Sequence, residues 1–415
     1  MRAKLITLIA IAFTCFQAKA TTGPKKDTTK VLTEIELQML KADSLKQMNQ
    51  FELALEYWEF VLTDFTSSHM NRLRALNESA DLYRELDLKT KSKDRLTEAR
   101  AQLPSNTEHK NLRSENLLFW GRYYSDSNQK DSALQSFRNA AFLAEEINDN
   151  KLKFLSWVEL GNFYRNTVNN DLAAVYYYNK AVSLSEEGKV NMPIIEARTS
   201  FAMAETANEL NEKEKAIDYS QEALHLMDSL EASVHYDFIA DLNYLMATLY
   251  IGLNEPEDAI KHLTRAIDLR KTYSPEDQTY NKTYYYPTLS MAYEATHSFD
   301  SAILIEERLS SLTASDDINT RLETQYRLAT LYLKQGDLLQ ANKLSSAYLK
   351  YHIANSAPSS PEIFKALIAR ADYFFAANLP DSAFHFYTRS LKTIDGGLTI
   401  DNLAEKVSEA QISAH

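Results

Sequence analysis

Cysteine, glycine and proline are all scarce in this chain of 415 residues, and each shortage excludes a class of structure. The single cysteine, Cys15, allows no disulfide within the chain and no zinc site built from several thiolates. Eight glycines and nine prolines leave few helix breakers, and the plentiful alanine and leucine favour an all-helical protein. Apolar residues make up 45% of the chain, which is enough for a large core and excludes disorder by composition.

Long apolar runs are also missing, apart from a short one near the start. A transmembrane helix needs about 18 consecutive apolar residues, so the sequence predicts no membrane span in the mature chain. The start itself combines the basic residues Arg2 and Lys4, an apolar stretch over residues 5–13 and the small-x-small end Ala18-Lys19-Ala20. This three-part pattern predicts a secretory signal peptide over residues 1–20, and therefore a periplasmic or secreted protein.

Two alternatives to a cleaved signal peptide remain at this stage. The chain could be cytosolic, with residues 5–13 as part of an apolar first helix. Cys15 could instead carry a lipid anchor, but Ala12-Phe13-Thr14 before it make a poor lipobox. We therefore expect cleavage after Ala20, which removes the only cysteine.

The charge balance is acidic, since 45 lysines and arginines face 57 aspartates and glutamates. Loss of Arg2, Lys4 and Lys19 with the signal peptide would take the formal charge from −12 to −15. A chain this acidic repels nucleic acid unless it carries a separate basic face, and no run of lysines or arginines provides one. The sequence thus predicts no nucleic-acid partner.

One pattern recurs through most of the chain. It consists of a small residue, then an aromatic or large residue four positions later, then a small or apolar residue after three more. Ala133, Phe137 and Ala140 form its clearest copy. The nine copies begin at Ala54, Ser92, Ala133, Ala174, Ala216, Ala259, Ala302, Ala341 and Ala383, and those at Ser92, Ala302, Ala341 and Ala383 are weaker. The copies are 38, 41, 41, 42, 43, 43, 39 and 42 residues apart.

A second pattern precedes each copy by about twelve residues, with apolar residues at the period of a buried helix stripe. Trp157, Leu160, Gly161 and Tyr164 give its sharpest example. Turn-rich pieces lie between the two patterns, and their Asn, Asp and Ser residues are expected to cap the second helix. Each repeat is therefore predicted to be helix–turn–helix, with small residues where the two helices cross closely.

These residues resemble the tetratricopeptide repeat, whose signature is W-x2-L-G-x2-Y followed by A-x3-F. Trp157 to Tyr164 match the first half, and Ala133 with Phe137 match the second. The period near 41 exceeds the usual 34 by about two helical turns, as in the long-repeat branch that includes kinesin light chains and some bacterial regulators. The resemblance implies an all-α, right-handed α-solenoid of about nine repeats. A generic antiparallel bundle is the alternative, but it has no reason to keep a fixed period.

The predicted repeat array covers residues 31–395. A flexible lead-in over residues 21–30 precedes it, and a polar, partly helical C-terminal tail over residues 396–415 follows. Two runs of tyrosine, 176–178 and 284–286, fall within the array. Consecutive residues of a helix cannot all face one way, so one tyrosine of each run is expected to be exposed.

No group of residues in the sequence suggests catalysis. The nine histidines are scattered, and none pair at the spacing of helix-borne zinc ligands. A glycine-rich phosphate loop is absent, and the paired carboxylates fall near helix ends, where solvated charge is usual. We therefore predict that the protein is not an enzyme and has no catalytic residues, no cofactor and no metal site.

The resemblance implies that the first helices line a concave face along which a partner lies. The residue after each small packing position faces this groove, together with its neighbours one turn away. The predicted peptide-binding residues are Arg84, Arg122, Asn162, Arg165, Arg198, Asn208, Tyr244 and Tyr326. Arginine and asparagine dominate the first half, which favours a partner with an acidic segment there. The alternative is that these arginines pair with nearby acids such as Asp81 and Glu205.

The sequence thus predicts a non-enzymatic scaffold, exported to the periplasm, that binds a protein or peptide partner in the envelope. The alternative is the input region of an envelope regulator, of histidine-kinase or transcription-regulator type, either truncated or free-standing. An outer-membrane nutrient-binding lipoprotein would need a better lipobox than the one before Cys15.

Overall fold

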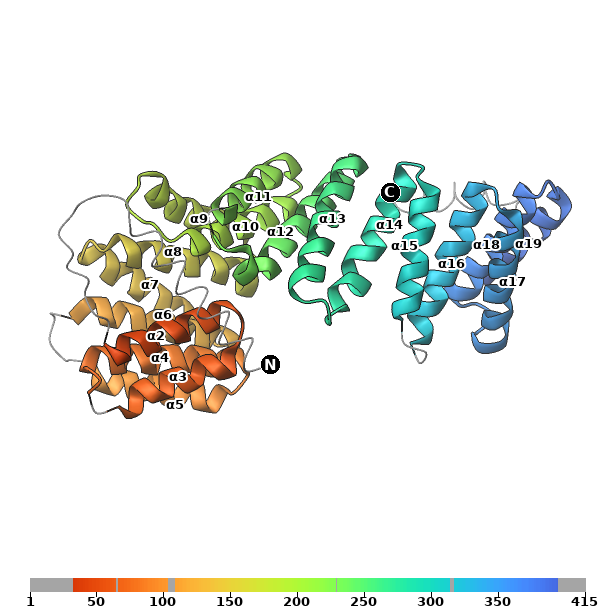
Figure 1. Cartoon of the computed structure of the whole chain (residues 1–415). Coiled ribbons are helices and arrows are strands. Elements are labelled where there is room, and N and C mark those ends of the chain that lie inside the picture. Colours follow the sequence, from red (N-terminus) through yellow and green to blue (C-terminus); the bar gives the residue numbers. More distant parts are fainter. Residues whose placement is uncertain (1–32, 65, 104–108, 229, 314–316, 395–415) are drawn as a thin grey trace, which may run out of the picture. The chain divides into compact units, whose positions relative to one another are not determined.

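The computed structural model describes residues 33–394, except for 65, 104–108, 229 and 314–316. The predicted signal peptide with Cys15, the lead-in and the tail therefore lie outside the described residues. The described part of the chain consists of helices and turns without a β-strand (Figure 1), which confirms the all-α prediction. Among these helices, none is both long and apolar enough to cross a membrane.

The chain divides into two compact units, residues 1–88 and 89–415, which we describe separately. Unit 1 contains α2 (Glu34–Gln47), α3 (Phe51–Thr63) and α4 (His69–Glu85). The side chain of Thr33 accepts the N–H of Glu36 and begins α2 as a capping box. The core of this unit surrounds Trp58, whose side chain is completely buried among Ala42, Ala54 and Val61.

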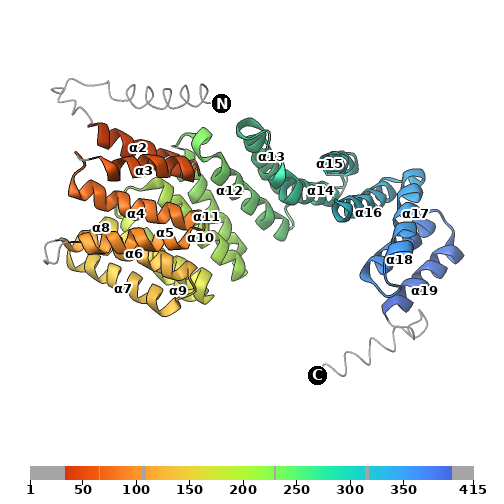
Figure 2. The same ribbon diagram turned by 90° about the horizontal axis from the view of Figure 1, so that it is seen from below.

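Unit 2 contains the remaining fifteen described α-helices and two short π-helices. They are α5 (Lys89–Gln102), α6 (Lys110–Asp126), α7 (Lys130–Glu146), α8 (Asn150–Phe163), η2 (Tyr164–Val168), α9 (Asp171–Glu186), α10 (Pro193–Glu209), α11 (Lys213–Asp228), α12 (Ala232–Gly252), α13 (Pro256–Tyr273), η3 (Asn281–Tyr285), α14 (Tyr286–Ala295), α15 (Phe299–Leu312), α16 (Ile318–Gln335), α17 (Leu338–Asn355), α18 (Pro361–Ala376) and α19 (Pro380–Ile394). From α10 to α19 the helices can be followed in chain order in Figure 2.

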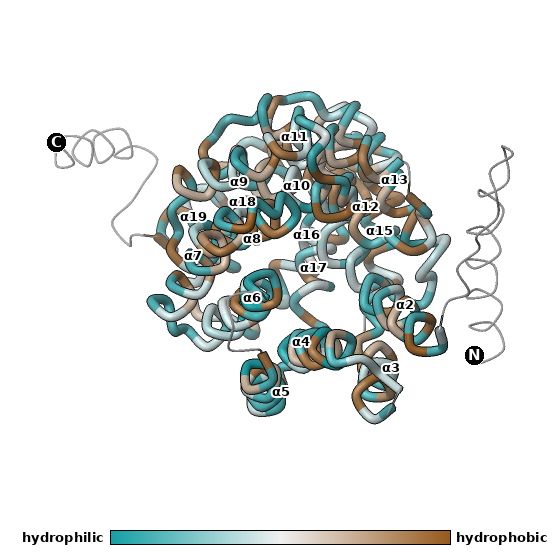
Figure 3. Tube along the Cα trace, turned by 90° about the vertical axis from the view of Figure 1, so that its left-hand side faces the viewer, coloured by the Kyte–Doolittle hydropathy of each residue, from teal (hydrophilic) through white to brown (hydrophobic). Residues whose placement is uncertain are grey.

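The helices of unit 2 pack mainly against their neighbours in sequence, as in a repeat protein. Apolar and polar residues are mixed along single helices such as α12 (Figure 3), so each helix buries one face and exposes another. Taken in chain order, the eighteen described α-helices are the number that nine helix–turn–helix repeats require. The prediction of about nine helix–turn–helix repeats is confirmed.

A residue with left-handed backbone follows each first helix in the described chain. These residues are Asn49, Asp87, Asn128, Asn169, Asn211, Asn254, His297, Gly336 and Asn378. Each lies five residues before the small residue that begins the motif of the second helix, so the turns repeat with the same spacings as the motif. This conformation lets turn N–H groups bond the last helical carbonyls, as Gln129 does to Tyr124 at 2.8 Å. Asn and Gly tolerate it best, which explains their prevalence here.

The expected capping of the second helices is only partly confirmed. Asn170 and Asp337 do cap α9 and α17, because their side chains accept the N–H of Ala173 and Gln340. At α7 and α13 the capping position holds Gln129 and Glu255, and neither makes a capping bond. In α13 a proline occupies the first turn, where its missing N–H costs nothing.

Side-chain size is matched across the crossing of the two helices in a pair. A Cβ atom at Gly121 would lie 2.3 Å from the ring of Phe137, and one at Gly161 would lie 2.4 Å from the ring of Tyr178. These two glycines therefore make room for an aromatic side chain on the second helix. In the pair α12–α13 the second helix supplies the smaller Leu263, and the first helix supplies an alanine, Ala247, in the same core cluster.

Three repeats place a polar residue where others place this large side chain, namely Ser220 of α11, Glu306 of α15 and Ser345 of α17. In the two C-terminal ones this residue contacts an arginine of the next repeat. Glu306 on α15 is completely buried and accepts a hydrogen bond from Arg327 Nε on α16. Arg327 also donates to Ser290 Oγ at 3.1 Å. The equivalent position of α17 is Ser345, whose Oγ lies 3.1 Å from Arg370 Nη1 on α18. The motif is weak in this part of the sequence because polar pairs replace apolar packing between these repeats.

Candidate functional site

In unit 2, side-chain contacts join each first helix to the next one. We call the surface that these contacts follow the first-helix face. The contacts are Arg122–Glu159 between α6 and α8, Arg165–Glu205 between η2 and α10, Phe201–Phe238 between α10 and α12, Tyr244–Tyr284 between α12 and η3, Glu294–Lys334 between α14 and α16, and Glu323–Lys365 between α16 and α18. The outer junctions are therefore ion pairs, and the two central junctions are aromatic.

The predicted arginines on this face have partners within the chain. Arg122 Nε lies 2.8 Å from Glu159 Oε1. Arg165 Nη1 lies 2.9 Å from Glu205 Oε2, and its Nη2 lies 3.5 Å from Glu209 Oε1. These pairs follow the alternative that the sequence left open, in which arginines of the stripe pair with nearby acids. In unit 1, Arg84 Nε likewise lies 3.0 Å from Asp81 Oδ1.

The other predicted binding residues of unit 2 differ in the contacts that they make within the chain. The guanidinium of Arg198 lies 5.2 Å from the ring centroid of Phe238. Asn162 Oδ1 accepts a hydrogen bond from the hydroxyl of the buried Tyr178 at 2.8 Å, so this asparagine serves the core. Asn208 is exposed on α10. The ring centroid of Tyr326 lies 5.5 Å from that of Tyr348, on the second helix of the same repeat.

Five aromatic residues gather at the two central junctions, and we call them the aromatic surface. They are Phe201, Phe238, Tyr244, Tyr280 and Tyr284. Ring centroids are 5.6 Å apart for Phe201 and Phe238, 5.8 Å for Tyr244 and Tyr284, and 6.0 Å for Tyr280 and Tyr284. Tyr280 and Tyr284 keep 37% and 45% of their surface exposed. The rings of Tyr280 and Tyr284 offer flat apolar contact area that the chain itself leaves uncovered, beside the partly buried rings of Phe201, Phe238 and Tyr244.

Sequence reasoning had found only part of this surface. In the tyrosine runs the expectation of one exposed residue is confirmed, since Tyr176 and Tyr284 are exposed while Tyr178, Tyr285 and Tyr286 are buried. Tyr280 and Tyr284 were missed as binding residues because they belong to η3 and its start. A π-helical turn shifts the facing residues relative to the regular helical register used for the prediction.

A buried arginine lies beside the aromatic surface. The side chain of Arg270 on α13 is only 5% exposed and contacts the carboxylates of Asp237 and Asp241 on α12. Its guanidinium lies 3.9 Å from the ring centroid of Tyr280 and 5.7 Å from that of Tyr236. Burial raises the pKa of Asp241, although Arg270 opposes the shift.

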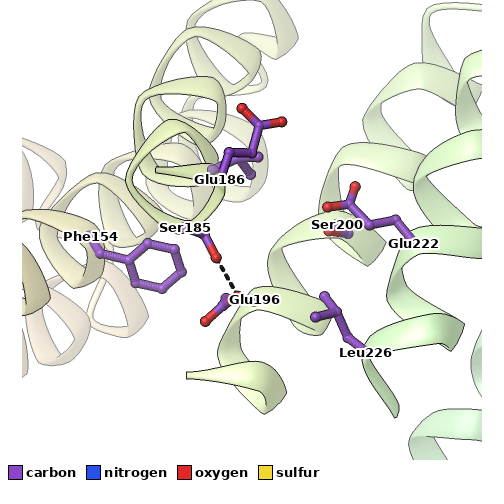
Figure 4. Close-up of a pocket in the computed structure, with 8 residues that line it drawn as sticks. Phe154, Ser185, Glu186, Glu196, Ser200, Glu222 and Leu226 are labelled. Atoms are coloured by element: carbon purple, nitrogen blue, oxygen red, sulfur yellow. Dashed lines mark hydrogen bonds between the residues drawn. The ribbon is translucent and has the colours of Figure 1, made fainter. Parts of the chain in front are cut away.

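A small cavity of about 140 Å³ lies between α8, α9, α10 and α11 (Figure 4). Three carboxylates line it, from Glu186, Glu196 and Glu222. Glu196 accepts hydrogen bonds from Ser185 Oγ and from the backbone N–H of Met192, so it closes the start of α10. Burial, and then the charge of Glu186, raise the pKa of Glu222. In the described part of the chain, no three His, Cys, Asp or Glu residues are placed to hold a metal ion.

Two segments of the chain match family models described as tetratricopeptide repeat, over residues 240–273 and 326–397. A comparison with curated proteins found no matching sequence.

Solved structures resemble the chain at low sequence identity. The apo form of RapI has a TM-score of 0.54 and 17% identity, over 89% of this chain and 100% of that one. A signal transduction ATPase with a tetratricopeptide repeat sensor, from Pyrococcus horikoshii, has a TM-score of 0.54 and 16% identity over 85% of this chain. The match covers 52% of the archaeal chain, about half its length. These likenesses show the fold.

Proposed function

The chain is a tetratricopeptide-repeat protein, and from that premise we propose that the first-helix face of unit 2 binds a peptide or protein segment, centred on the aromatic surface. Such folds generally serve as scaffolds and not as catalysts. Repeats of this kind present long surfaces built from many small units, which suits an extended partner. The proposal assigns binding, without a chemical step, to this face.

The proposal rests on the contrast between the junctions that join successive first helices. Ion pairs close the junctions at both ends of the face, whereas the two central junctions are aromatic. Tyr280 and Tyr284 are exposed there, and the other rings of the aromatic surface are partly buried. The exposed Met291 lies two helical turns beyond Tyr284 and adds apolar surface at 50% exposure. Tyrosine and methionine are enriched in interface cores, because they contribute large contact areas there.

An acidic partner segment, which the sequence favoured, is not part of this proposal. Arg122 and Arg165 already contact carboxylates within the chain. A partner carboxylate would have to displace Glu159 or Glu205 before it could bind either guanidinium. Exchange of one ion pair for another brings little net free energy, since such pairs contribute about 0–1 kcal/mol at a surface.

Binding can be tested with a peptide display library selected against the purified chain. We expect Phe238→Ala combined with Tyr284→Ala to weaken the selected peptides by at least about 30-fold, because the loss of even one aromatic hot spot costs about 2 kcal/mol. Fluorescence anisotropy would measure the dissociation constants. Tyr176→Ala is the matched control, since this tyrosine is 58% exposed but lies on the second helix α9. Equal weakening by control and double variant would contradict the proposal.

The proposed place of action is the periplasm, on the basis of the signal-peptide pattern over residues 1–20. We expect the mature protein from a Gram-negative host to begin at Thr21. Mass spectrometry of its N-terminal peptide, after separation of periplasm and cytoplasm, measures this directly. An intact Met1 in the cytoplasmic fraction would contradict export.

An input role in signalling is the second candidate. It is supported by the archaeal relative in fold, whose repeat region is described as a sensor. The same face would then bind the signal.

A further inference from the structure

We infer that the bound segment carries a lysine or arginine side chain that docks against the carboxylates of Asp237 and Asp241, next to the aromatic surface. The inference rests on the proposed function, because it specifies the chemistry of the segment that the first-helix face binds. It reverses the sign of the charge that the arginine stripe in the sequence suggested.

Asp237 and Asp241 lie one helical turn apart on α12 and share a single cation. The contacts of both carboxylates to Arg270 use their Oδ1 atoms. The Arg270 side chain is 5% exposed, whereas those of Asp237 and Asp241 are 37% and 43% exposed. The guanidinium of Arg270 therefore lies below the protein surface. The carboxylates of Asp237 and Asp241 lie at the surface, where an incoming segment meets them first.

The aromatic rings around Arg270 also make its guanidinium less accessible than the two carboxylates. Tyr280 and Tyr236 lie against its guanidinium, so an anion from outside has no open approach to that group. An incoming cation meets the opposite situation, since the outer sides of Asp237 and Asp241 face solvent. The geometry favours a positive group from the partner and disfavours a negative one.

A second arrangement of the same kind lies nearby, where the charge of Asp241 contributes to the raised pKa of Glu205. Arg165 is 16% exposed and contacts Glu205 and Glu209, which are 33% and 52% exposed. Here too one guanidinium lies deeper than two carboxylates. The exposed cation in this region is Arg198, which lies over Phe238. Carboxylates near the aromatic surface thus pair with arginines that are mostly covered.

Incomplete neutralisation of these acids supports the inference. Burial raises the pKa of Asp241 and of Glu205, and the neighbouring Arg270 and Arg165 reduce that shift without abolishing it. A further positive charge would stabilise both ionised carboxylates. The methylene stem of a lysine or arginine would at the same time lie along the exposed ring of Tyr280 or Tyr284, and its head could make a cation–π contact.

The first experiment varies the peptide, so that the fold of the protein stays untouched. A positional-scanning nonapeptide library is bound to the purified full chain, and lysine or arginine is expected at one fixed distance from an aromatic or aliphatic residue. Replacement of that lysine by norleucine should weaken binding about 10-fold in dilute buffer, and the difference should shrink in about 0.5 M salt because exposed charges are screened. Enrichment of aspartate or glutamate, or no loss with norleucine, would overturn the inference and leave the proposed function intact.

The second experiment locates the lysine on the protein. Asp241→Asn keeps an oxygen that can accept from Arg270, and it should reduce the advantage of the lysine peptide over its norleucine version to about twofold. The matched control is Glu145→Gln on α7, which also removes one half-exposed carboxylate but should preserve that advantage. An unchanged ratio in Asp241→Asn would refute the assigned place. A library that yields no binding peptide would refute both the inference and the proposed function.

Discussion

Arg327→Leu is expected to lower the free energy of unfolding by about 3–5 kcal/mol, because it leaves the carboxylate of Glu306 buried without its cation. Glu306 has no exposed surface, and its Oε2 atom already lacks a hydrogen-bond partner. Within the described residues its ion-pair partner is Arg327, which is 23% exposed. Urea unfolding followed by circular dichroism would measure the loss.

The double variant Arg327→Leu with Glu306→Leu should recover most of this loss. Replacement of both members of a buried ion pair by apolar residues is often neutral or stabilising. The chain itself accepts leucine at the equivalent position, as Leu263 of α13 shows. Arg265→Leu serves as a control, since Arg265 is 54% exposed and its nearest carboxylate lies 3.9 Å away. A double variant as unstable as the single one would contradict the assigned role of the ion pair.

The second large effect is expected from Gly161→Ala, which should destabilise unit 2 by about 2 kcal/mol. The new Cβ would lie 2.4 Å from Tyr178 Cε1 and 2.5 Å from Cδ1, closer than any van der Waals contact permits. Overpacking of this kind costs about 1–3 kcal/mol. Tyr178 has little freedom to move, because it is fully buried and its hydroxyl is bonded to Asn162.

Tyr178→Leu should relieve the clash and copy the pair that the chain uses at Ala247 and Leu263. Tyr178→Leu alone leaves a cavity and an unbonded Asn162 oxygen. We expect the double variant to be about 1–2 kcal/mol more stable than the sum of the two single effects, as a double-mutant cycle of unfolding free energies would show. Strict additivity would mean that residues 161 and 178 are not matched in size.

The repeat register was predictable because it is fixed by local chemistry. Each second helix begins its motif five residues after a left-handed turn residue, and seven of the nine turn residues are asparagine or aspartate. The length of the helices follows from the same spacing. The absence of side-chain capping at Gln129 and Glu255 was not predictable in the same way, because the turn geometry there is satisfied by backbone bonds alone.

The candidate site was harder to predict, since it depends on contacts between repeats. The sequence predicted Arg122 and Arg165 as residues of the concave face, but their carboxylate partners lie about 40 residues away, one repeat later. The deeper position of Arg270 beneath Asp237 and Asp241 also depends on how two helices cross. The sequence pattern predicts on which side of a helix a residue lies. The burial and the ion-pair partner of its side chain depend on the neighbouring helices.

The polar link between Glu306 and Arg327 also limits how the array can be rearranged by duplication or recombination. A repeat ending in α13 presents Leu263 within an apolar core, so a copy of it could be inserted beside similar repeats. A copy of the α14–α15 repeat inserted elsewhere would bring a buried carboxylate to a neighbour that lacks Arg327. The order of the last repeats is therefore set by their chemistry, and α14 to α17 are expected to be inherited as one block.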